Sequence, residues 1–503
     1  MSVLLLAALA LPGGLATALL ADRRRAAYAV GLATAVACVV LAASIDAADT
    51  VPIAGSVIGG SDGLRTLAVA WALSTLIFGV VDALLGDGPA VLGPALIGLG
   101  VGAVGLAAAD AGIGFTFLTA GAILAAVVPI GMVHGGTAAA PGLGLRALRP
   151  LLAAGFISLV AVAWGASAVG PFATPGVPGQ VDPALANGLG LALLAVAAAS
   201  AIRLGAVPAH AWAARYAEAM PASAVPPVLG WGAAAFVLVA FGWLEVTVSN
   251  SSAPLSAERG IIVLVAVASV ILGGIAALVH DDVEHVLAYS IVQDAGITLL
   301  AISTSGATSA AAGRDWILAA VAVKSGLAAW VLVTRATFGS HRQVDLRGWA
   351  RRSPILGLAL ALVLLGAVGL PGMASFEARA TLIRLAVPGP LAMIVLLAAF
   401  APVVFIGRLL VGGVDAMAEP VRSATHATAR IRDFRVAGWG DGDSPLRAVP
   451  AAVRANRYPL AAVGAVLAAI LGLSVAIGGL GSTTVSEGAG GYEPSSTEIV
   501  TSP

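Results

Sequence analysis

Charged residues and cysteine are scarce in this chain. Only 10% of its 503 residues are Asp, Glu, Lys or Arg, whereas soluble domains carry roughly 25%. The single cysteine, Cys38, excludes an internal disulfide and a cysteine-ligated metal or iron–sulfur site. A formal net charge of +0 gives no electrostatic reason to expect nucleic acid as a partner. We therefore predict no cofactor and no metal in this chain, and any redox group would lie in another subunit.

Lysine is the scarcest of the charged residues. The chain has 26 basic residues, and Lys324 is the only lysine among them. A buried lysine can lose its proton, whereas an arginine effectively cannot. Because Lys324 lies in the middle of an apolar run, its position suits proton exchange. An equally weighted alternative is a lysine that Asp294 or Glu377 neutralises and that serves packing only.

Apolar residues, by contrast, are abundant. Hydrophobic residues make up 59% of the chain, and the mean hydropathy is +1.00. A helix needs about 20 apolar residues to cross a bilayer. Continuous spans are predicted over 3–20, 26–44, 63–85, 89–109, 113–133, 149–169, 225–248, 260–280, 286–304, 315–336, 389–412 and 457–480.

Two longer apolar stretches, 184–218 and 354–387, are interrupted. The first is broken near Gly205 and Pro208, and the second near Pro371 and Gly372. Counting each as one crossing predicts an all-α polytopic membrane protein with about 14 transmembrane helices. Two broken helices in separate halves, with charges beside the breaks, favour an inverted-repeat transporter fold.

The distribution of arginine predicts the direction of the helices. Arg23, Arg24 and Arg25 follow the first apolar run, which favours an uncleaved helix that enters from outside. With the predicted crossings, most loop arginines fall inside the cell, and only Arg259 and Arg314 fall in outer loops. We expect a multi-pass protein of the inner (plasma) membrane with both termini outside.

Ionisable side chains within spans are functional candidates because their burial in lipid is costly. These candidates are Asp82, Arg203, Asp294, Lys324, Glu377, Arg379 and Arg384. We expect Asp82, near the end of its span, to reach the membrane surface, and Glu245 to be a solvated helix-end charge. His280 and His285 flank three carboxylates; a solvated charge cluster is favoured there over a metal site.

Five segments in order resemble one family of membrane proteins. PAHAW at 208–212 with AEAMPAS at 217–223 resembles that family's P-F-H-x-W signature and the segment after it. The other four are DGLRTLAVAW at 62–71, HDDVEHVLAYSIVQDAG at 280–296, AAVAVKSGLAAW at 319–330 and GLPGMASFEAR at 369–379. Together they are similar to the antiporter-like subunits of respiratory complex I (NADH-quinone oxidoreductase) and of Mrp sodium/proton antiporters.

The resemblance implies a fold and a set of site residues. The fold has two inverted repeats with discontinuous seventh and twelfth helices, around a polar axis at the membrane midplane. We accordingly expect N-terminal helices over 1–85, repeats over 89–248 and 260–412, a cytoplasmic Arg-rich loop over 413–456, a last helix over 457–480 and a disordered tail over 481–503. The resemblance places family pathway positions on Arg203, Lys324 and Arg379. With the charges Asp294 and Glu377 within the spans, these form the predicted ion pathway, and the motif residues are Pro208, His210, Trp212, Pro371 and Gly372.

This sequence also departs from the family pattern in its first half. The family's seventh-helix lysine falls on Arg203, its eighth-helix lysine falls within Ala233–Ala235, and no Glu or Asp occurs from 111 to 140. Because arginine cannot act as a deprotonating relay, the first half is predicted to be disabled as a proton channel, while the second half keeps Lys324.

Three functions remain open from the sequence. The first is a subunit of a proton-translocating complex, complex I-like or Mrp-like, that conducts protons along an axis centred on Lys324, with other membrane and peripheral subunits as partners. The second is a membrane partner of a soluble zinc protein in energy-coupled inorganic-carbon uptake. The third is a non-conducting scaffold. Catalysis by the chain alone is not expected; an enzymatic activity would belong to an NADH-quinone oxidoreductase-type assembly.

Overall fold

The computed structural model describes residues 2–53, 56–85, 90–169, 183–248 and 255–415. The predicted last helix 457–480, the predicted tail 481–503 and almost all of the predicted loop 413–456 lie outside these residues. Ten helices of the described part are long and apolar enough to cross a membrane. The chain is thus a mostly helical, multi-pass membrane protein, while the number of about 14 helices stays a prediction.

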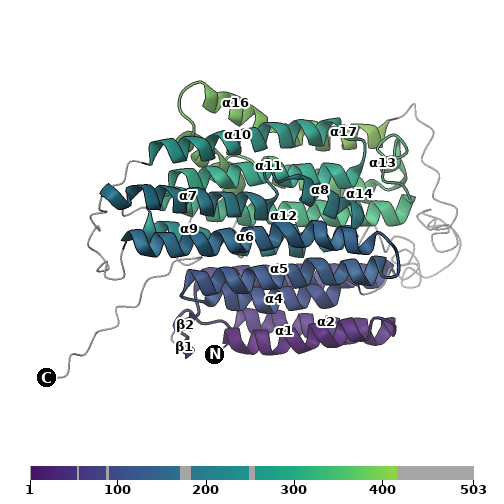
Figure 1. Ribbon diagram of the computed structural model, residues 1–503. Coiled ribbons are helices and arrows are strands. Elements are labelled where there is room, and N and C mark those ends of the chain that lie inside the picture. Colours follow the sequence, from purple (N-terminus) through teal and green to yellow (C-terminus); the bar gives the residue numbers. More distant parts are fainter. Residues whose placement is uncertain (1, 54–55, 86–89, 170–182, 249–254, 416–503) are drawn as a thin grey trace, which may run out of the picture.

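The first six helices form one side of the bundle (Figure 1). They are α1 (Ser2–Leu19), α2 (Arg24–Ala43), α3 (Asp62–Leu85), α4 (Leu92–Ala107), α5 (Ala111–His134) and α6 (Ala140–Val169). A hairpin that was not predicted, β1 (Thr50–Ile53) with β2 (Ser56–Gly59), lies between α2 and α3.

The remaining helices stack on these and include both interrupted elements. They are α7 (Pro183–Leu204), α8 (Ala211–Ala219), η1 (Ala222–Ala224), η2 (Pro226–Trp231), α9 (Gly232–Thr247), α10 (Ser256–Val279), α11 (Val283–Thr304), α12 (Ala307–Phe338), α13 (Trp349–Arg352), α14 (Pro354–Val368), α15 (Ala374–Ala386), α16 (Leu391–Ala399) and α17 (Ala401–Val414).

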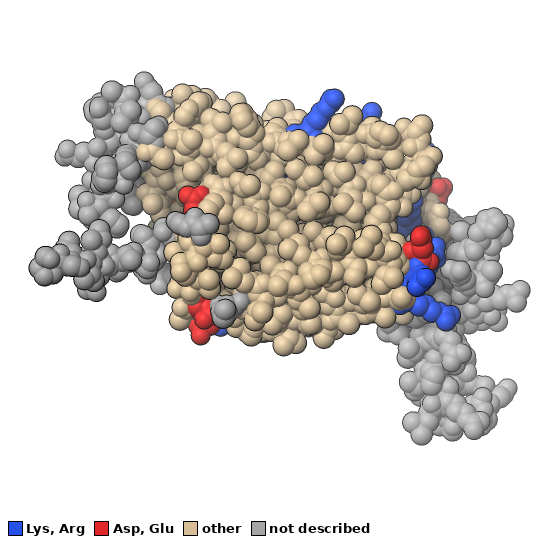
Figure 2. Space-filling model, turned by 60° about the horizontal axis from the view of Figure 1, so that its bottom comes forward, with Lys and Arg blue, Asp and Glu red and all other residues tan. Residues whose placement is uncertain are grey.

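Helix ends gather on two opposite sides of the molecule. At one end, the Ser2 side, Ser2 donates a hydrogen bond to Ser44, and Ile58 bridges to Ala108. At the other end, the Arg408 side, Arg408 pairs with Asp281 at 3.0 Å. In Figure 2 most visible charged atoms lie toward the two ends, with a broad belt of uncharged residues between them. Such a belt suits the lipid interior.

The first predicted interruption is present between α7 and α8. Gly205 has a φ of 71°, a left-handed conformation that side chains disfavour. The break frees backbone groups, and side chains satisfy two of them: the Trp212 indole donates to the Ile202 carbonyl, and the Val207 N–H donates to Ser269 Oγ. Trp212 of the PAHAW motif therefore has a structural role at the break, and Pro208 follows a cis peptide bond there.

The second interruption separates α14 from α15. Gly369 and Gly372 have φ values of 68° and 90°, and the Gly372 N–H donates to Glu377 Oε1 at 3.2 Å. Leu370, Pro371 and Gly372 are exposed on the surface of the bundle. Both breaks coincide with the positions that glycine and proline predicted in the sequence.

The structure also differs from the sequence expectation within several predicted helices. The helix predicted over 315–336 runs over Ala307–Phe338, so Arg314 lies within α12, where it is 3% exposed, and not in a loop. The predicted helix 389–412 is divided at Phe400 into α16 and α17. The predicted helix 225–248 begins with a π-helical segment, η2, a local irregularity that often marks functional sites.

Candidate functional site

Lys324 and Asp294 form a buried ion pair between two helices. Lys324 Nζ on α12 lies 3.1 Å from Asp294 Oδ2 on α11, and the two side chains are 6% and 14% exposed. Asp294 lies near the middle of α11, which has 22 residues, and Lys324 lies near the middle of α12, which has 32 residues. The pair therefore lies deep in the apolar belt, where an unpaired charge would be costly.

Arg379 on α15 is the second cation at this site. It interacts electrostatically with Asp294, and it is 1% exposed. Its guanidinium donates to the carbonyls of Ala367 and Val368, which the break after α14 leaves without helical partners. Arg379 is therefore a fixed positive charge, because two backbone carbonyls hold it and its proton cannot leave.

Aromatic side chains complete the surroundings of Asp294 and Arg379. The Arg379 guanidinium lies 4.4 Å from the centroid of the Phe400 ring and 5.8 Å from that of Trp316, which suits cation–π attraction. The Trp316 indole N–H donates to the Asp294 carbonyl at 3.2 Å. Sequence analysis missed Trp316 and Phe400, because no spacing signal connects residues brought together from α12 and the α16–α17 junction.

The structure does not bring all the predicted site residues together. Lys324, Asp294 and Arg379 form one cluster, whereas Glu377 accepts a hydrogen bond from the backbone of Gly372 at the break. Arg203 lies elsewhere, at the last turn of α7, and donates to the Val228 carbonyl of η2 at 2.8 Å. His210 lies beside Tyr289, with ring centroids 6.1 Å apart.

The first half lacks a corresponding carboxylate–lysine pair among the described residues. Arg203 is 1% exposed, and its Nε and Nη2 have no hydrogen-bond partner in the described part of the chain. Ala233, Ala234 and Ala235 are fully buried on α9. Phe115 of α5 packs on Phe236 of α9 with ring centroids 4.7 Å apart. Alanine side chains and aromatic rings therefore fill this interface between α5 and α9.

A second cluster of titratable groups lies at the Arg408 side. The His280 ring stacks on His285 and on Tyr289, with centroids 4.8 Å and 4.9 Å apart. Burial, followed by the charge of His285, lowers the pKa of His280. Burial raises the pKa of Asp282, but the Glu284 hydrogen bond and the nearby His341 and His285 outweigh it and lower that pKa overall.

These groups hold no metal site in the described part of the chain, where no set of three or more His, Cys, Asp or Glu has suitable geometry. Ion pairs connect the cluster instead: Glu284 pairs with Arg335 at 2.9 Å, and Asp282 lies 3.7 Å from His341. Near the Ser2 side, Glu245 pairs with Arg314 of α12. Glu245, expected to be a solvated charge, thus joins α9 to α12.

Comparison with known proteins matches the part of the chain that holds this site to one family model. The family model described as "NADH:quinone oxidoreductase/Mrp antiporter, TM" matches residues 182–405, which contain both breaks and the Lys324 cluster. Residues 182–405 are therefore similar to this family in sequence. The resemblance that five sequence motifs indicated is therefore confirmed.

Relatives of the NADH:quinone oxidoreductase/Mrp antiporter family agree in sequence and in fold. NADH-quinone oxidoreductase subunit N 1 of Streptomyces griseus is 36% identical over 220 residues, which cover 43% of this chain and 45% of that protein. The chain thus matches less than half the length of the first curated relatives. A chain of respiratory complex I from Thermus thermophilus has a TM-score of 0.67 at 18% identity and covers 94% of this chain and 99% of its own.

A chain of the Mrp complex from Dietzia sp. has the same overall architecture. Its TM-score is 0.61 at 18% identity, over 96% of this chain and 96% of its own. At that identity the likeness concerns the fold alone. The fold of these two chains therefore extends along most of this chain, including its first half.

Proposed function

We propose that this chain is a proton-conducting membrane subunit of a multi-subunit complex of the complex I or Mrp type, and that Lys324 and Asp294 form its proton-exchange site. The observation that carries the proposal is the buried Lys324–Asp294 pair at 3.1 Å, with Arg379 beside the same carboxylate. Only one of these two cations, the lysine, can release a proton.

The proposed exchange depends on the choice of partner of Asp294. While Asp294 pairs with Lys324, the carboxylate stabilises the ammonium form. If the carboxylate turns toward Arg379, the ammonium is left in a poorly solvated site that disfavours its charge, and Lys324 releases its proton. The return of Asp294 favours proton uptake again. Arg379, held by the Ala367 and Val368 carbonyls, remains charged throughout.

In this proposal, the first half of the chain does not conduct protons. Arg203 replaces a relay lysine, and the alanines and aromatic rings between α5 and α9 provide no proton-exchanging side chain. We propose that protons pass through the second repeat, over 260–412, and that the first repeat, over 89–248, supplies structure. The two alternatives, a zinc-protein partner in inorganic-carbon uptake and a non-conducting scaffold, gain no support from the relatives above.

Partners are proposed from the family and from one surface feature. The relatives named above are subunits or chains of multi-subunit complexes. The break at Leu370–Gly372 is exposed, with Leu370 54% exposed, and irregular backbone at membrane depth is tolerated only where protein or water covers it. We propose that a neighbouring membrane subunit covers this face. Purification from native membranes in mild detergent should retain further multi-span subunits; isolation of the chain alone would contradict this.

The orientation is also a proposal. On the Arg408 side lie Arg23–Arg25, Arg146, Arg215, Arg342, Arg347 and Arg351, which the positive-inside rule assigns to the cytoplasm. The N-terminus, on the Ser2 side, would then lie outside in the inner membrane.

Substitution of Lys324 tests the proposed exchange. Lys324→Arg keeps the positive charge next to Asp294 but removes a proton that can leave, so protonophore-sensitive proton flux in sealed vesicles should be lost while the complex still assembles. Lys324→Ala should lose flux as well. Normal flux with Lys324→Arg would overturn the relay, whatever the effect of alanine.

A further inference from the structure

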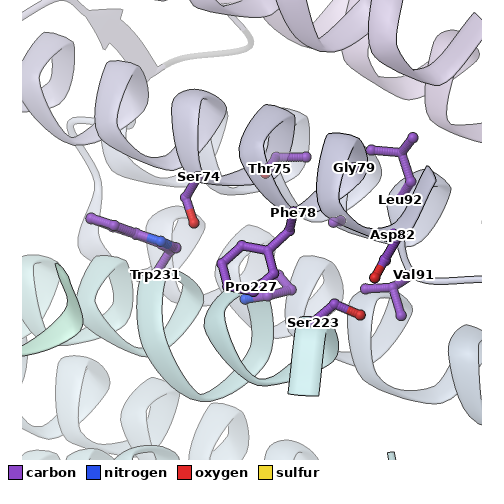
Figure 3. A pocket seen from close by; sticks show the side chains of 11 residues that line it. Ser74, Thr75, Phe78, Gly79, Asp82, Val91, Leu92, Ser223, Pro227 and Trp231 are labelled. Carbon is purple, nitrogen blue, oxygen red and sulfur yellow. The ribbon is translucent and has the colours of Figure 1, made fainter. Parts of the chain in front are cut away.

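Two charged side chains within spans outside the Lys324 site are enclosed by protein. Asp82 of α3, expected to reach the membrane surface, is instead 5% exposed and lines a small pocket (Figure 3). That pocket, of about 10 Å³, has room for one water molecule at most. Arg203 is likewise buried, at 1% exposed. Exposed charges next to exposed apolar side chains lie instead on α6.

Helix α6 has one face packed in the bundle and one face directed outward. The buried positions recur at helical spacing: Ala147, Leu151, Ala154, Ser158 and Ala161. The exposed positions recur at the same spacing: Leu145, Arg149, Leu152, Phe156 and Leu159. Because residues three and four apart lie on one face of a helix, the exposed positions form a single stripe, apolar except for Arg149.

Arg146 and Arg149 lie at the end of this stripe, on the Arg408 side. They are three residues apart, so their side chains are neighbours, and both are exposed. Other arginines on this side pair with carboxylates: Arg215 with Glu218, Arg335 with Glu284 and Arg408 with Asp281. Within the described part of the chain, Arg146 and Arg149 have no such partner. Two adjacent positive charges are therefore available to a ligand.

Trp164 indicates the depth of these arginines in the membrane. It is 43% exposed and lies 18 residues after Arg146 on α6, a rise of about 27 Å. The hydrocarbon core is about 30 Å thick, and tryptophan and arginine side chains favour its two boundaries. With Trp164 at one boundary, Arg146 and Arg149 lie at the level of the lipid headgroups on the Arg408 side.

We propose that Arg146, Arg149 and the apolar stripe below them bind an anionic phospholipid of the membrane leaflet on the Arg408 side. A guanidinium donates two parallel hydrogen bonds to a phosphate, and basic side chains at the membrane surface attract anionic lipids. Leu152 and Phe156 follow Arg149 by about 4.5 Å and 10.5 Å along the helix, where an acyl chain of the same lipid packs against them.

The charge of the site selects among lipids. A zwitterionic headgroup carries an ammonium group that the two arginines repel, whereas an anionic headgroup does not. The exposed apolar stripe by itself would accept any acyl chain, so the preference depends on Arg146 and Arg149. The inference goes beyond the proposed proton exchange and does not depend on Lys324.

A photoreactive side chain on the stripe tests the proposal in the whole complex in native membranes. p-Benzoylphenylalanine replaces Phe156, which is 71% exposed, and light couples it to a neighbouring C–H bond. Mass spectrometry of the labelled peptide then identifies the headgroup of the attached lipid. The matched position is Leu272 on α10, which is 51% exposed, and the charges at that end of α10, Asp281 and Arg408, pair with each other.

The measured quantity is the ratio of anionic to zwitterionic lipid among the adducts, divided by the same ratio in the membrane extract. It should be at least about three-fold higher at position 156 than at position 272. Arg146→Gln with Arg149→Gln should lower it to the value at position 272. Arg342→Gln with Arg347→Gln removes two exposed arginines of the loop between α12 and α13, and should leave it unchanged.

Three results would overturn the proposal. Equal ratios at positions 156 and 272, a comparison that needs no arginine substitution, would mean that the stripe does not select anionic lipid. A high ratio that Arg146→Gln with Arg149→Gln leaves unchanged would mean that these arginines do not bind the headgroup. Adducts of position 156 with another protein chain would mean that a subunit covers this face of α6. None of these results bears on Lys324, whose role is judged by proton flux.

Discussion

The residues of the Lys324 site differ in how far the sequence could identify them. Lys324 and Asp294 stand out because each places a charged side chain in an apolar span, where burial of a charge costs free energy. Arg379 stands out for the same reason, but its two carbonyl partners are set by the break after Val368. Trp316 and Phe400 could not be predicted, because their contact with Arg379 exists only after α12, α15 and α16 have packed.

At the residue scale, the lowered pKa of His280 predicts how the stability of the fold depends on pH. Burial and the adjacent His285 lower the pKa of His280 below its ordinary value of about 6.5. In the window between the lowered and the ordinary pKa, the unfolded chain binds more protons than the folded one, so stability falls as the pH falls. Above about pH 6.5, both states bind the same number of protons at His280, so this loss of stability is absent.

His280→Gln should therefore reduce the loss of thermal stability between about pH 7 and pH 5, measured as the unfolding midpoint of the purified complex. His134→Gln is a suitable control, because it removes a histidine that bonds to the Ala219 carbonyl and does not belong to the stack of His280, His285 and Tyr289. A midpoint that falls equally in the wild type and in His280→Gln would show that this histidine does not carry the dependence.

At the element scale, close helix contacts depend on glycine. α10 and α11 approach so closely that an added Cβ at Gly296 would lie 2.5 Å from the Ala266 carbonyl oxygen and 2.8 Å from the Val270 nitrogen. Helices in lipid associate mainly through such packing, because apolar side chains gain little from leaving lipid for protein. The α10–α11 contact matters for function because α11 carries Asp294.

Gly296→Val should force α10 and α11 apart and destabilise the protein by about 1–3 kcal/mol, the usual cost of overpacking. Gly260→Val is the matched control on α10, because a Cβ there meets no atom within 4 Å. Thermal unfolding in detergent compares the two. A midpoint for Gly296→Val as high as that of Gly260→Val would contradict this account of the contact.

Some elements could be predicted and others could not, for identifiable reasons. Apolar length predicted the long helices, and glycine with proline predicted the breaks at Gly205–Pro208 and Pro371–Gly372, because both signals are local. The hairpin over Thr50–Gly59 and the π-helical segment η2 have no such signal. Arg314 was assigned to a loop because hydropathy alone cannot detect that Glu245 neutralises it inside α12.

At the scale of the whole molecule, the two halves have similar helix breaks but different charged groups. Each half has a broken helix with an arginine bound to backbone carbonyls: Arg203 to Val228, and Arg379 to Ala367 and Val368. Only the second half adds a lysine–carboxylate pair among the described residues. We therefore propose that proton exchange takes place in the second half alone, at Lys324, the only lysine of the sequence.

Proton flux in sealed vesicles that contain the whole complex tests this claim most directly, with wild type and Lys324→Arg compared at equal abundance. The account predicts that Lys324→Arg assembles and unfolds like the wild type but lowers protonophore-sensitive flux by at least about ten-fold, because a guanidinium cannot release the proton. Flux equal to that of the wild type would contradict it, and would leave Lys324 as a packing residue neutralised by Asp294.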